Sequence, residues 1–479
     1  MKRELFEMAD AASATMMKLS EVAAALHADL RGGDAAFSGI CTDSRAVNPG
    51  DLFVALTGEK FDGHNFLDVA ARRGAIAALV HKPVADSALA LIVCRDTLAA
   101  LGKLAAYWRG KFTLPLVALT GSNGKTTVKE MLAGILRSHC NDEASVLATE
   151  GNLNNHIGMP LTLLKLRAQH RYAVIEMGMN HEGEISYLTQ IARPHVALVN
   201  NAQRAHVGEV GGLEAVARAK GEIFSGLDTG GIAIINADDP SEPLWRSMAH
   251  KYRRLTFGLT QPADITAKIQ LNATGTPMSV QTPQGSFSTL LMVPGEHNAR
   301  NALAACATAV ALEIPLPAIA RGLSNFSGVK GRLQRKPGIN GADIIDDTYN
   351  ANPDSAAAAI AVLAKSAGRK ILVLGDMGEL GAEGADLTRE IGGYAKKSGI
   401  DVLLTLGELS GHAAAAFGPG ATEFTTIEDL VAALAPLLNA DAVVLVKGSR
   451  FMRMERVVDA IARPNLSAAV GTLDAKESK

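Results

Sequence analysis

The sequence lacks the features of a membrane or disulfide-stabilised protein. No apolar run approaches the roughly 18 residues that a spanning helix needs, and the charged segment before Met17 has no secretory-type apolar stretch. There are only four cysteines, far apart and without metal-ligand spacing: Cys41, Cys94, Cys140 and Cys306. This usage indicates reduced thiols. We therefore expect a cytoplasmic protein, with no packed structure before Met17.

An excess of charge of either sign is also missing. Lys and Arg number 47 and Asp and Glu number 49, so no bulk field recruits nucleic acid or an anionic membrane. The hydrophobic content of 48% and charged content of 20% are those of an ordinary globular protein. Because 479 residues exceed what one hydrophobic core supports, we expect three domains.

The hydrophobic patterns predict an α/β protein in three parts. Residues 1–95 mix short apolar runs with turn-rich stretches, which indicates a small α/β domain. In residues 96–329, apolar strands alternate with helical patterns, which predicts a central phosphate-loop domain built on a parallel sheet. Short alternating strands between Ile265 and Val293 predict an antiparallel extension at the edge of that sheet. Residues 330–479 carry further buried-strand runs, which predict a doubly wound, Rossmann-like C-terminal domain.

A glycine-rich loop between an apolar run and a helical pattern carries the clearest chemistry. In a strand–loop–helix arrangement of this kind, backbone N–H groups of the loop bind phosphate. The lysine at the end of the loop neutralises the phosphate charge, and the hydroxyl group of the next residue binds Mg²⁺. Leu119 stands where the longer form of this pattern has its first glycine, so the loop is a shortened variant. The alternative is a plain connecting turn. The expected nucleotide-binding residues are Gly121, Ser122, Asn123, Gly124, Lys125, Thr126 and Thr127.

Two polar residues follow buried strands of the central domain. Glu176 ends the run YAVIE, so its carboxylate is expected at the edge of the sheet where ligands bind, as a second Mg²⁺ ligand. The alternative for Glu176 is a solvated strand end. His206 follows the run VALVNNAQRA, and the residues alone do not decide between a ligand and an ordinary loop histidine.

Lys220 lies in the middle of an apolar helical stripe. The stripe consists of Leu213, Val216, Ile223, Phe224 and Leu227. A charged amine facing the core is costly unless it is paired or chemically altered. The alternative is a lysine whose stem lies along the core while its amine reaches water.

Three polar groups point to a site between domains. His297, Asn298 and Asn301 begin a helix, where they either cap it or face a ligand. Arg332 could reach phosphate from the third domain, although a lone surface arginine is the alternative. The dense cluster after the run ADII suggests a site rather than a simple turn, and it contains Asp346, Asp347, Tyr349, Asn350 and Asn352. By composition alone, residues 42–45 and 151–155 read as surface loops.

Read together, the motifs resemble those of the Mur ligase family of peptidoglycan synthesis, in the family's order. The resemblance covers roughly Met17 to Val458. It rests on TDSR, DLFVAL with FDGHNF, TGSNGKTT, GNLNNHIGMP, IEMGMNHEGEI, ARAKGEIF, INADD, GEHNARNALAA, DDTYNANP, GDMGELG and VKGSR.

The resemblance implies a role for each matched residue. Lys125 and Thr126 would bind ATP and Mg²⁺, Glu176 and His206 would hold a second metal ion, and Lys220 would be carbamylated. Three residues would contact ATP: Asn298, Asn301 and Arg332. The stretch near the UDP group would be Thr42, Asp43, Ser44 and Arg45. The loop that meets the sugar-peptide would contain Gly151, Asn152, Asn154 and Asn155. The third domain would line the catalytic cleft with Asp347, Tyr349, Asn350 and Asn352.

The resemblance also implies the reaction and the partners. UDP-N-acetylmuramoyl-tripeptide would be activated by ATP to an acyl phosphate and joined to D-alanyl-D-alanine by an amide bond. GDMGELG favours the dipeptide, and the DNPR stretch of the diaminopimelate-adding form is absent. The alternatives are a family member that adds a single amino acid and, from another class, a phosphate-loop nucleotide switch. We expect a monomer that binds neither nucleic acid nor the membrane interior.

Overall fold

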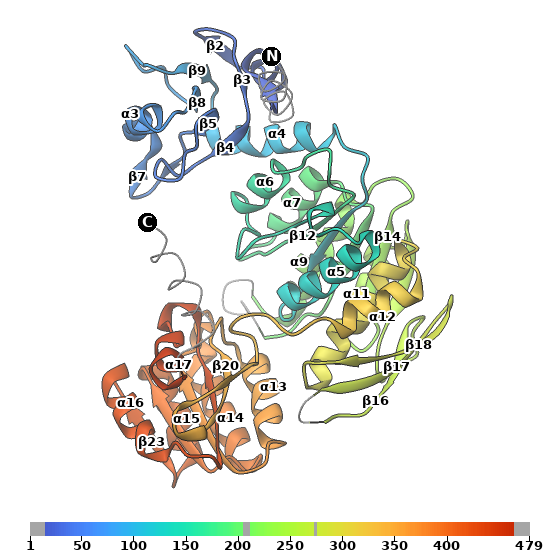
Figure 1. Ribbon diagram of the computed structural model, residues 1–479, viewed down its shortest axis with the longest axis vertical. Coiled ribbons are helices and arrows are strands. Elements are labelled where there is room, and N and C mark those ends of the chain that lie inside the picture. Colours follow the sequence, from blue (N-terminus) through green and yellow to red (C-terminus); the bar gives the residue numbers. More distant parts are fainter. Residues whose placement is uncertain (1–14, 205–210, 273–274, 464–479) are drawn as a thin grey trace, which may run out of the picture.

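The computed structural model describes residues 15–204, 211–272 and 275–463, which form three units around separate sheets (Figure 1). The α/β fold and the three-part architecture predicted from the sequence are confirmed. The division at residues 95/96 and 329/330 stays a prediction. Residues 1–14 of the expected N-terminal extension lie outside the described residues. Among the described helices, none combines the length and apolar character needed to cross a bilayer.

The N-terminal unit contains a five-stranded sheet in the order β2-β9-β8-β5-β4, in which only β2 is antiparallel to its neighbour. The strands are β2 (Asp29–Arg31), β4 (Gly39–Cys41), β5 (Asp51–Val54), β8 (Ala77–Val80) and β9 (Ala90–Val93). Two short antiparallel pairs join β1 (Met17–Lys18) to β3 (Ala36–Phe37) and β6 (Thr57–Gly58) to β7 (Phe61–Asp62). The unit's helices are α2 (Leu19–Leu26) and α3 (Leu67–Arg72).

Helix α4 (Thr97–Arg109) joins the N-terminal unit to the central unit. It begins where the Asp96 side chain accepts hydrogen bonds from two backbone N–H groups of the first turn, at 2.8 and 3.0 Å. Its buried side chains, including Leu101 and Leu104, belong to one hydrophobic cluster that contains residues of both units. Trp108 donates from its indole to the Leu166 carbonyl oxygen at 3.1 Å. The first two units therefore share a core.

The central unit is built on a six-stranded, wholly parallel sheet in the order β11-β12-β10-β13-β14-β15. The strands are β10 (Leu116–Thr120), β11 (Val146–Ala148), β12 (Tyr172–Glu176), β13 (Val196–Val199), β14 (Ile232–Asn236) and β15 (Arg253–Phe257). Alternate strand residues face two different clusters, as the two-residue period requires. One face is covered by α5 (Lys125–Cys140), α11 (Glu296–Ala311) and α12 (Leu316–Ser324). The other face is covered by α6 (Gly158–Leu163), α7 (Glu184–Ala192), α9 (Leu213–Gly221) and α10 (Glu242–Met248).

The predicted antiparallel strands are present, but they do not extend the central sheet. They form a separate three-stranded sheet from β16 (Thr266–Ile269), β17 (Thr276–Thr282) and β18 (Gly285–Leu291). A single parallel bridge between Phe257 and Ile265 connects it to the end of β15. Its inner residues Met278 and Val280 are buried in the hydrophobic cluster under α11 and α12. This small sheet is therefore held by packing against helices rather than by pairing along the edge of the central sheet.

The C-terminal unit has the doubly wound form that the sequence predicts. Its six-stranded sheet has the order β19-β20-β24-β21-β22-β23 and is parallel except for β19. The strands are β19 (Gln334–Pro337), β20 (Asp343–Asp347), β21 (Arg369–Gly375), β22 (Val402–Leu406), β23 (Ala421–Phe424) and β24 (Ala442–Lys447). Helices α13 (Pro353–Ala364), α14 (Gly384–Lys397) and α15 (Glu408–Phe417) cover one face, and α16 (Ile427–Leu434) and α17 (Glu455–Ile461) cover the other. The sequence analysis did not find the edge strand β19.

The close contact between α5 and α12 depends on Gly322. A Cβ atom at this position would lie 2.4 Å from the Cα atom of Ile135. We therefore expect Gly322→Ala to destabilise the central unit by about 1–3 kcal/mol through overpacking. Gly134, on the other helix of the pair, is the matched control, since its added Cβ would meet only a carbonyl oxygen at 3.9 Å. Gly134→Ala should stabilise slightly through helix propensity. Calorimetric unfolding midpoints measure both, and equal midpoints would contradict the packing model.

Candidate active site

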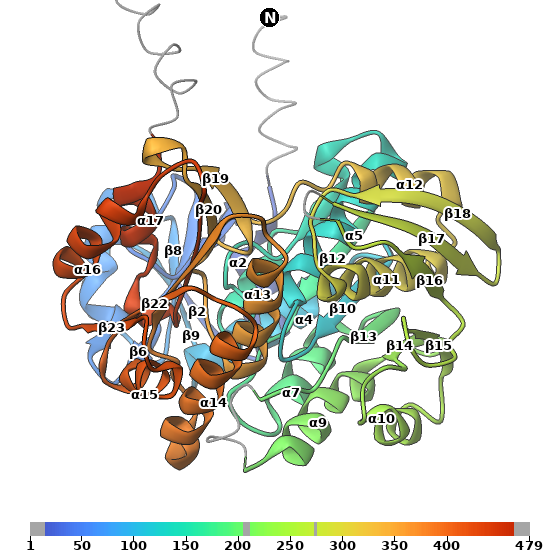
Figure 2. The same ribbon diagram turned by 90° about the horizontal axis from the view of Figure 1, so that it is seen from below.

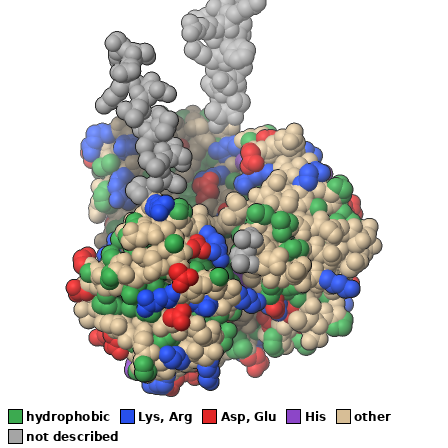
Figure 3. All heavy atoms as spheres, turned by 60° about the horizontal axis from the view of Figure 1, so that its bottom comes forward, with side chains coloured by type: hydrophobic (Ala, Val, Ile, Leu, Met, Phe, Trp, Pro, Cys, Tyr) green, Lys and Arg blue, Asp and Glu red, His purple; other side chains and the backbone are tan. Residues whose placement is uncertain are grey.

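A cleft of about 700 Å³ lies between the central and C-terminal units. Its walls come from loops at the carboxyl ends of strands in both parallel sheets, the position at which open α/β sheets bind ligands. Figure 2 shows α13 of the C-terminal unit facing the central unit. Figure 3 shows one outer face of the molecule, on which Lys and Arg side chains are scattered among acidic and hydrophobic ones.

The phosphate loop lies at the floor of the cleft, between β10 and α5. Gly121 and Gly124 have φ angles of 156° and 79°, and a Cβ atom at Gly124 would lie 2.3 Å from Asn301 Oδ1. Only glycine fits there without displacing that amide. Lys125 Nζ donates to the carbonyl oxygens of Gly121 at 2.7 Å and Ser122 at 3.3 Å. The amine therefore lies over the loop, beside the positive end of the α5 dipole.

Glu176 is buried at the end of β12 with both carboxylate oxygens engaged. Thr126 Oγ1 donates to Oε2 at 3.0 Å, and Asn154 Nδ2 donates to Oε1 at 2.8 Å. The Glu176 backbone N–H donates to Thr149 Oγ1 at 2.9 Å, which fixes the strand end. A carboxylate and a hydroxyl thus lie together as hard oxygen donors, which suits Mg²⁺.

Lys220 is completely buried on α9. Within the described residues its Nζ has no hydrogen-bond partner. Burial, and then the Lys125 cation, lower the pKa of Lys220 well below its usual range, and Glu176 opposes that shift. The predicted inward orientation of Lys220 is therefore present. Leu213, which we placed in the same buried stripe, is 44% exposed because it is the first residue of α9, so that assignment was wrong.

Asparagine side chains connect the phosphate loop to its surroundings. Asn200 Nδ2 donates to the Asn123 carbonyl oxygen at 2.9 Å and to Asn301 Oδ1 at 3.0 Å. The side chains of Asn123 and Asn352 exchange hydrogen bonds at 2.8 and 3.3 Å, across the boundary between the units. Asn298 instead donates to the Pro294 carbonyl oxygen at 2.8 Å, in the turn that begins α11. The Asn301 side chain thus faces the phosphate loop, whereas the Asn298 side chain forms its hydrogen bond within the turn at the start of its own helix.

The C-terminal unit brings Arg332 and Asp347 to the cleft. Arg332 Nη2 donates to Thr126 Oγ1 at 3.0 Å, and its guanidinium lies 4.2 Å from the centre of the Tyr349 ring. Asp347 accepts hydrogen bonds from Lys447 Nζ at 2.5 Å and from the Leu333 backbone N–H at 3.1 Å. Asp346, one residue earlier on β20, pairs with Lys336 at 2.7 Å and does not line the cleft. Strand alternation separates the two carboxylates.

The structure does not bring all predicted residues into the cleft. Asn152, Asn154 and Asn155 line it, and so does Asn350. The N-terminal stretch after β4 does not line it, and consists of Thr42, Asp43, Ser44 and Arg45. Gly151 also lies outside the lining, at a positive φ of 54°, and so do Gly121, Thr126 and Lys220. His206 lies outside the described residues.

The sequence analysis missed several residues that line the cleft, notably Asn200, Gln203 and Lys447. Lys447 offered the same signal as Glu176, because it is a charged residue at the end of a buried strand. Asn200 also follows directly on a buried strand, β13. Within the described residues, no three His, Cys, Asp or Glu side chains gather as a metal site.

The parallel sheet, the phosphate loop and the polar strand ends define a phosphate-loop nucleotide-binding protein, closed on one side by a second α/β unit. Family models match three successive stretches of the chain. These are the Mur ligase family catalytic domain over residues 36–109, the Mur ligase middle domain over 119–309 and the Mur ligase glutamate ligase domain over 331–450. The chain belongs to the Mur ligase family, whose members are ATP-dependent ligases.

Similar proteins span nearly the whole chain. The UDP-N-acetylmuramoyl-tripeptide--D-alanyl-D-alanine ligase of Escherichia coli (strain K12) is 44% identical over 453 residues, covering 94% of this chain and 98% of that one. The crystal structure of MurF from Acinetobacter baumannii has a TM-score of 0.87 at 38% identity, covering 93% and 98%. MurF ligase from Thermotoga maritima in complex with ADP has a TM-score of 0.79 at 29% identity, covering 88% and 96%.

His297 lines the cleft at the start of α11. Burial lowers its pKa to about 4, with Lys447 and Arg300 acting in the same direction and Asp347 opposing. The ordinary histidine pKa is about 6.5, so between the two values the unfolded chain binds a proton that the folded chain does not. We therefore expect stability to fall as the pH drops from about 6.5 towards 4.

The variant His297→Gln should lose that part of the pH dependence. Thermal unfolding midpoints at several pH values measure it, and exposed His250→Gln is the control. An NMR titration that places the pKa of His297 at its ordinary value would contradict the expectation.

Proposed function

We propose that the protein joins D-alanyl-D-alanine to UDP-N-acetylmuramoyl-tripeptide in the synthesis of peptidoglycan precursors, with ATP as the energy source. The observation that carries the proposal is the cleft itself. It places the phosphate loop of the central unit opposite Arg332 and Asp347 of the C-terminal unit. Similarity to ligases of this name over nearly the whole chain supports the choice of substrates.

The first step is attack by the terminal carboxylate of the tripeptide on the γ-phosphorus of ATP. An acyl phosphate forms and ADP leaves. Lys125, the N–H groups at the start of α5 and Arg332 offset the charge on the transferring phosphoryl group. Arg332 Nε is buried and has no hydrogen-bond partner among the described residues, so it is suited to bind a phosphate oxygen.

The second step is attack by the dipeptide amine on the acyl carbon. Phosphate leaves, the new C–N bond forms, and the amine gives up its proton. Asp347 and Lys447 lie where the C-terminal unit faces this reaction, with Lys447 also bound to the Asn350 carbonyl oxygen at 2.9 Å. Closure of the two units around the acyl phosphate excludes water, which would otherwise hydrolyse it.

Mg²⁺ fits the donor set on the central unit. Thr126 and Glu176 supply oxygen donors that are already hydrogen-bonded to one another. Thr126 would hold one Mg²⁺ with ATP, and Glu176 would hold a second together with His206 and a carbamylated Lys220. When bound, Mg²⁺ would offset negative charge on the phosphates of ATP.

The surroundings of Lys220 support its carbamylation. A neutral, buried amine is nucleophilic towards CO₂; a new N–C bond forms and one proton is released. The unpartnered Nζ thereby becomes an anionic group with two oxygens. The carbamate would lie near Glu176 and Lys125, whose charges both act on the pKa of Lys220.

The N-terminal unit is assigned to the uridine part of the substrate. Thr42, Asp43, Ser44 and Arg45 lie outside the cleft, on the unit that shares its core with the central unit. The residues that line the cleft from the side of the sugar-peptide would be Asn152, Asn154 and Asn155.

Mass analysis of the product tests the proposed function directly. ATP, UDP-N-acetylmuramoyl-tripeptide and D-alanyl-D-alanine should give a UDP-pentapeptide, ADP and phosphate. A parallel reaction offers UDP-dipeptide with a single amino acid as acceptor. Product in that reaction alone would favour a ligase that adds a single amino acid. Nucleotide binding without any product would favour a nucleotide switch.

Lys125→Ala should nearly abolish ligation while leaving the affinity for the UDP-substrate almost unchanged. The loss removes the cation over the phosphate loop, and groups of this kind contribute roughly 100- to 1,000-fold in rate. The exposed Lys103→Ala, on α4, is the matched control. Calorimetric binding and phosphate release separate the two effects. Comparable loss of UDP-substrate affinity would argue against separate sites for ATP and uridine.

Lys220→Ala should nearly eliminate ligation, and acetate should partly restore it by supplying a carboxylate in the space that the side chain leaves. Sodium chloride at equal ionic strength is the control. In the unaltered protein, ¹³C-bicarbonate should give a carbamate signal by NMR that is missing from Lys220→Ala. Full activity of Lys220→Ala without added acid would refute the carbamate.

A further inference from the structure

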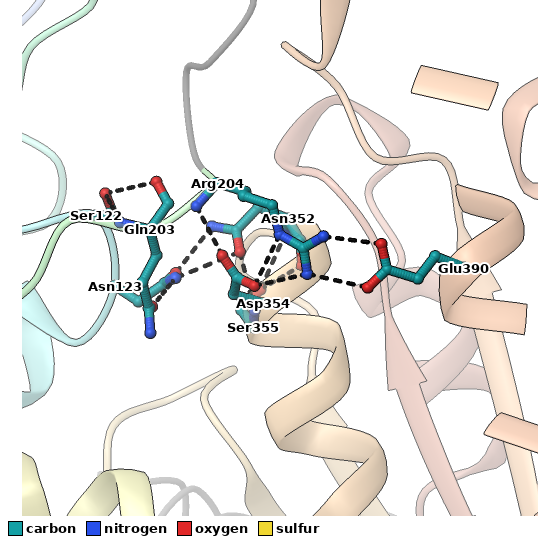
Figure 4. Close-up of polar contacts among 8 residues, drawn as sticks. All are labelled: Ser122, Asn123, Gln203, Arg204, Asn352, Asp354, Ser355 and Glu390. Atoms are coloured by element: carbon teal, nitrogen blue, oxygen red, sulfur yellow. Dashed lines mark hydrogen bonds and ion pairs between the residues drawn. The ribbon is translucent and has the colours of Figure 1, made fainter. Parts of the chain in front are cut away.

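One arginine crosses from the central unit to the C-terminal unit, immediately after β13 and the phosphate-loop contacts (Figure 4). Its backbone N–H donates to Asp354 Oδ2 at 2.7 Å, and Nε and Nη2 donate to Asp354 Oδ1 at 3.0 and 2.8 Å. Nη1 and Nη2 of the same residue, Arg204, donate to the two carboxylate oxygens of Glu390 at 2.8 and 3.2 Å. All five of these hydrogen bonds end on the C-terminal unit.

The segment that carries Arg204 is also tied to the phosphate loop. Gln203 exchanges hydrogen bonds with Ser122, through its backbone N–H at 2.9 Å and its carbonyl oxygen at 3.1 Å. Asn123 Nδ2 donates to Gln203 Oε1 at 2.6 Å. A displacement of Arg204 is therefore a displacement relative to the groups that hold phosphate.

On the other side, the Asp354 contact meets the first turn of α13. Asn352 caps this helix through a reciprocal pair of hydrogen bonds with Ser355 and also pairs with Asn123. Asp354 follows two residues later, and Glu390 stands on α14, which packs beside α13. Arg204 is thus bound to the helix that begins shortly after Asp347 and Asn350 in the sequence.

These hydrogen bonds fix the orientation of the Arg204 guanidinium relative to α13 as well as its distance from that helix. A guanidinium bound along two edges by two carboxylates, Asp354 on Nε and Nη2 and Glu390 on Nη1 and Nη2, cannot rotate without losing hydrogen bonds, unlike a lysine point charge. The side chains of Arg204 and Asp354 are 32% and 24% exposed, so the pair is partly shielded from water. Glu390, at 55% exposed, is the weaker partner.

We propose that Arg204 is a positioning residue for ligation, which clamps α13 to the phosphate loop so that the two walls of the cleft face each other. Arg204 itself does not line the cleft, so it acts through the placement of other groups. Displacements of about 1 Å can cost roughly 100-fold in rate, so an orienting clamp of this kind bears directly on turnover. The inference rests on the proposed function.

The clamp has a selective consequence. Breaking the clamp lowers the fraction of molecules in which the two units are closed on each other. A ligand that contacts both units binds only that fraction, so its apparent affinity falls in proportion. A ligand held by the other units alone loses nothing. The UDP-substrate should therefore keep its affinity, whereas turnover should fall.

The test compares Arg204→Ala and Glu390→Gln, singly and combined, with Arg246→Ala as the control. Arg246 has a similar carboxylate contact, but its partner Glu242 lies on the same helix, α10. We expect Arg204→Ala to lower kcat about tenfold with little change in UDP-substrate Kd, and to raise the radius of gyration measured by small-angle scattering without ligands. Glu390→Gln should have a smaller effect, and the double variant should be close to Arg204→Ala alone. Arg204→Lys should recover only part of the loss.

The readouts separate the two proposals. If the unaltered protein does not ligate but Arg204→Ala still opens the structure in scattering, the proposed function fails and the clamp stands. If the unaltered protein ligates and Arg204→Ala matches Arg246→Ala in both kcat and scattering, the clamp is refuted. If Arg204→Ala does not fold, Glu390→Gln is compared with Arg246→Ala in the same way. Equal kcat and equal scattering of these two variants would likewise refute the clamp.

Discussion

The burial of charge beside the phosphate loop is the constraint on which the site depends. Burial lowers the pKa of both Lys125 and Lys220, the Lys125 cation lowers the pKa of Lys220 further, and Glu176 opposes the shift in both lysines. The strand order explains the arrangement, because β10 carries the phosphate loop and its neighbour β12 ends at Glu176. Lys125 lies over the phosphate loop and Arg332 donates to Thr126 beside it, so the site favours ligands that bring negative charge, such as phosphates.

Sequence reasoning reached the parts of this site that depend on local patterns. Lys220 was found from helical periodicity alone, and Glu176 from its place at the end of an apolar strand, because both signals lie within about ten residues of the chain. It failed where long-range packing decides. Leu213 fits the periodicity but begins its helix in solvent, and β19 is an edge strand with an alternating burial that its short, charged sequence does not reveal.

The contacts between units were beyond sequence reasoning for a different reason. Arg204 lies 150 positions from Asp354 and 186 from Glu390, so no local pattern joins them. Asn352 illustrates the same limit. Its cap on α13 is a local contact with Ser355, whereas its bond to Asn123 depends on how the central and C-terminal units meet. The residue types were available from the sequence, but their pairing was not.

The contact between the N-terminal and central units differs in kind from the contact between the central and C-terminal units. This difference determines at which of the two contacts the units can move relative to each other. The N-terminal and central units share a hydrophobic cluster through α4, so separating them would expose apolar surface. The clusters of the C-terminal unit contain no residue of the central sheet, and the contacts across that boundary are polar side chains that water can replace. Gly328 and Gly331, with φ angles of 105° and 69°, lie in the single connecting segment between α12 and β19. Relative motion therefore concentrates at the face that carries the cleft, where opening admits substrates and closing excludes water.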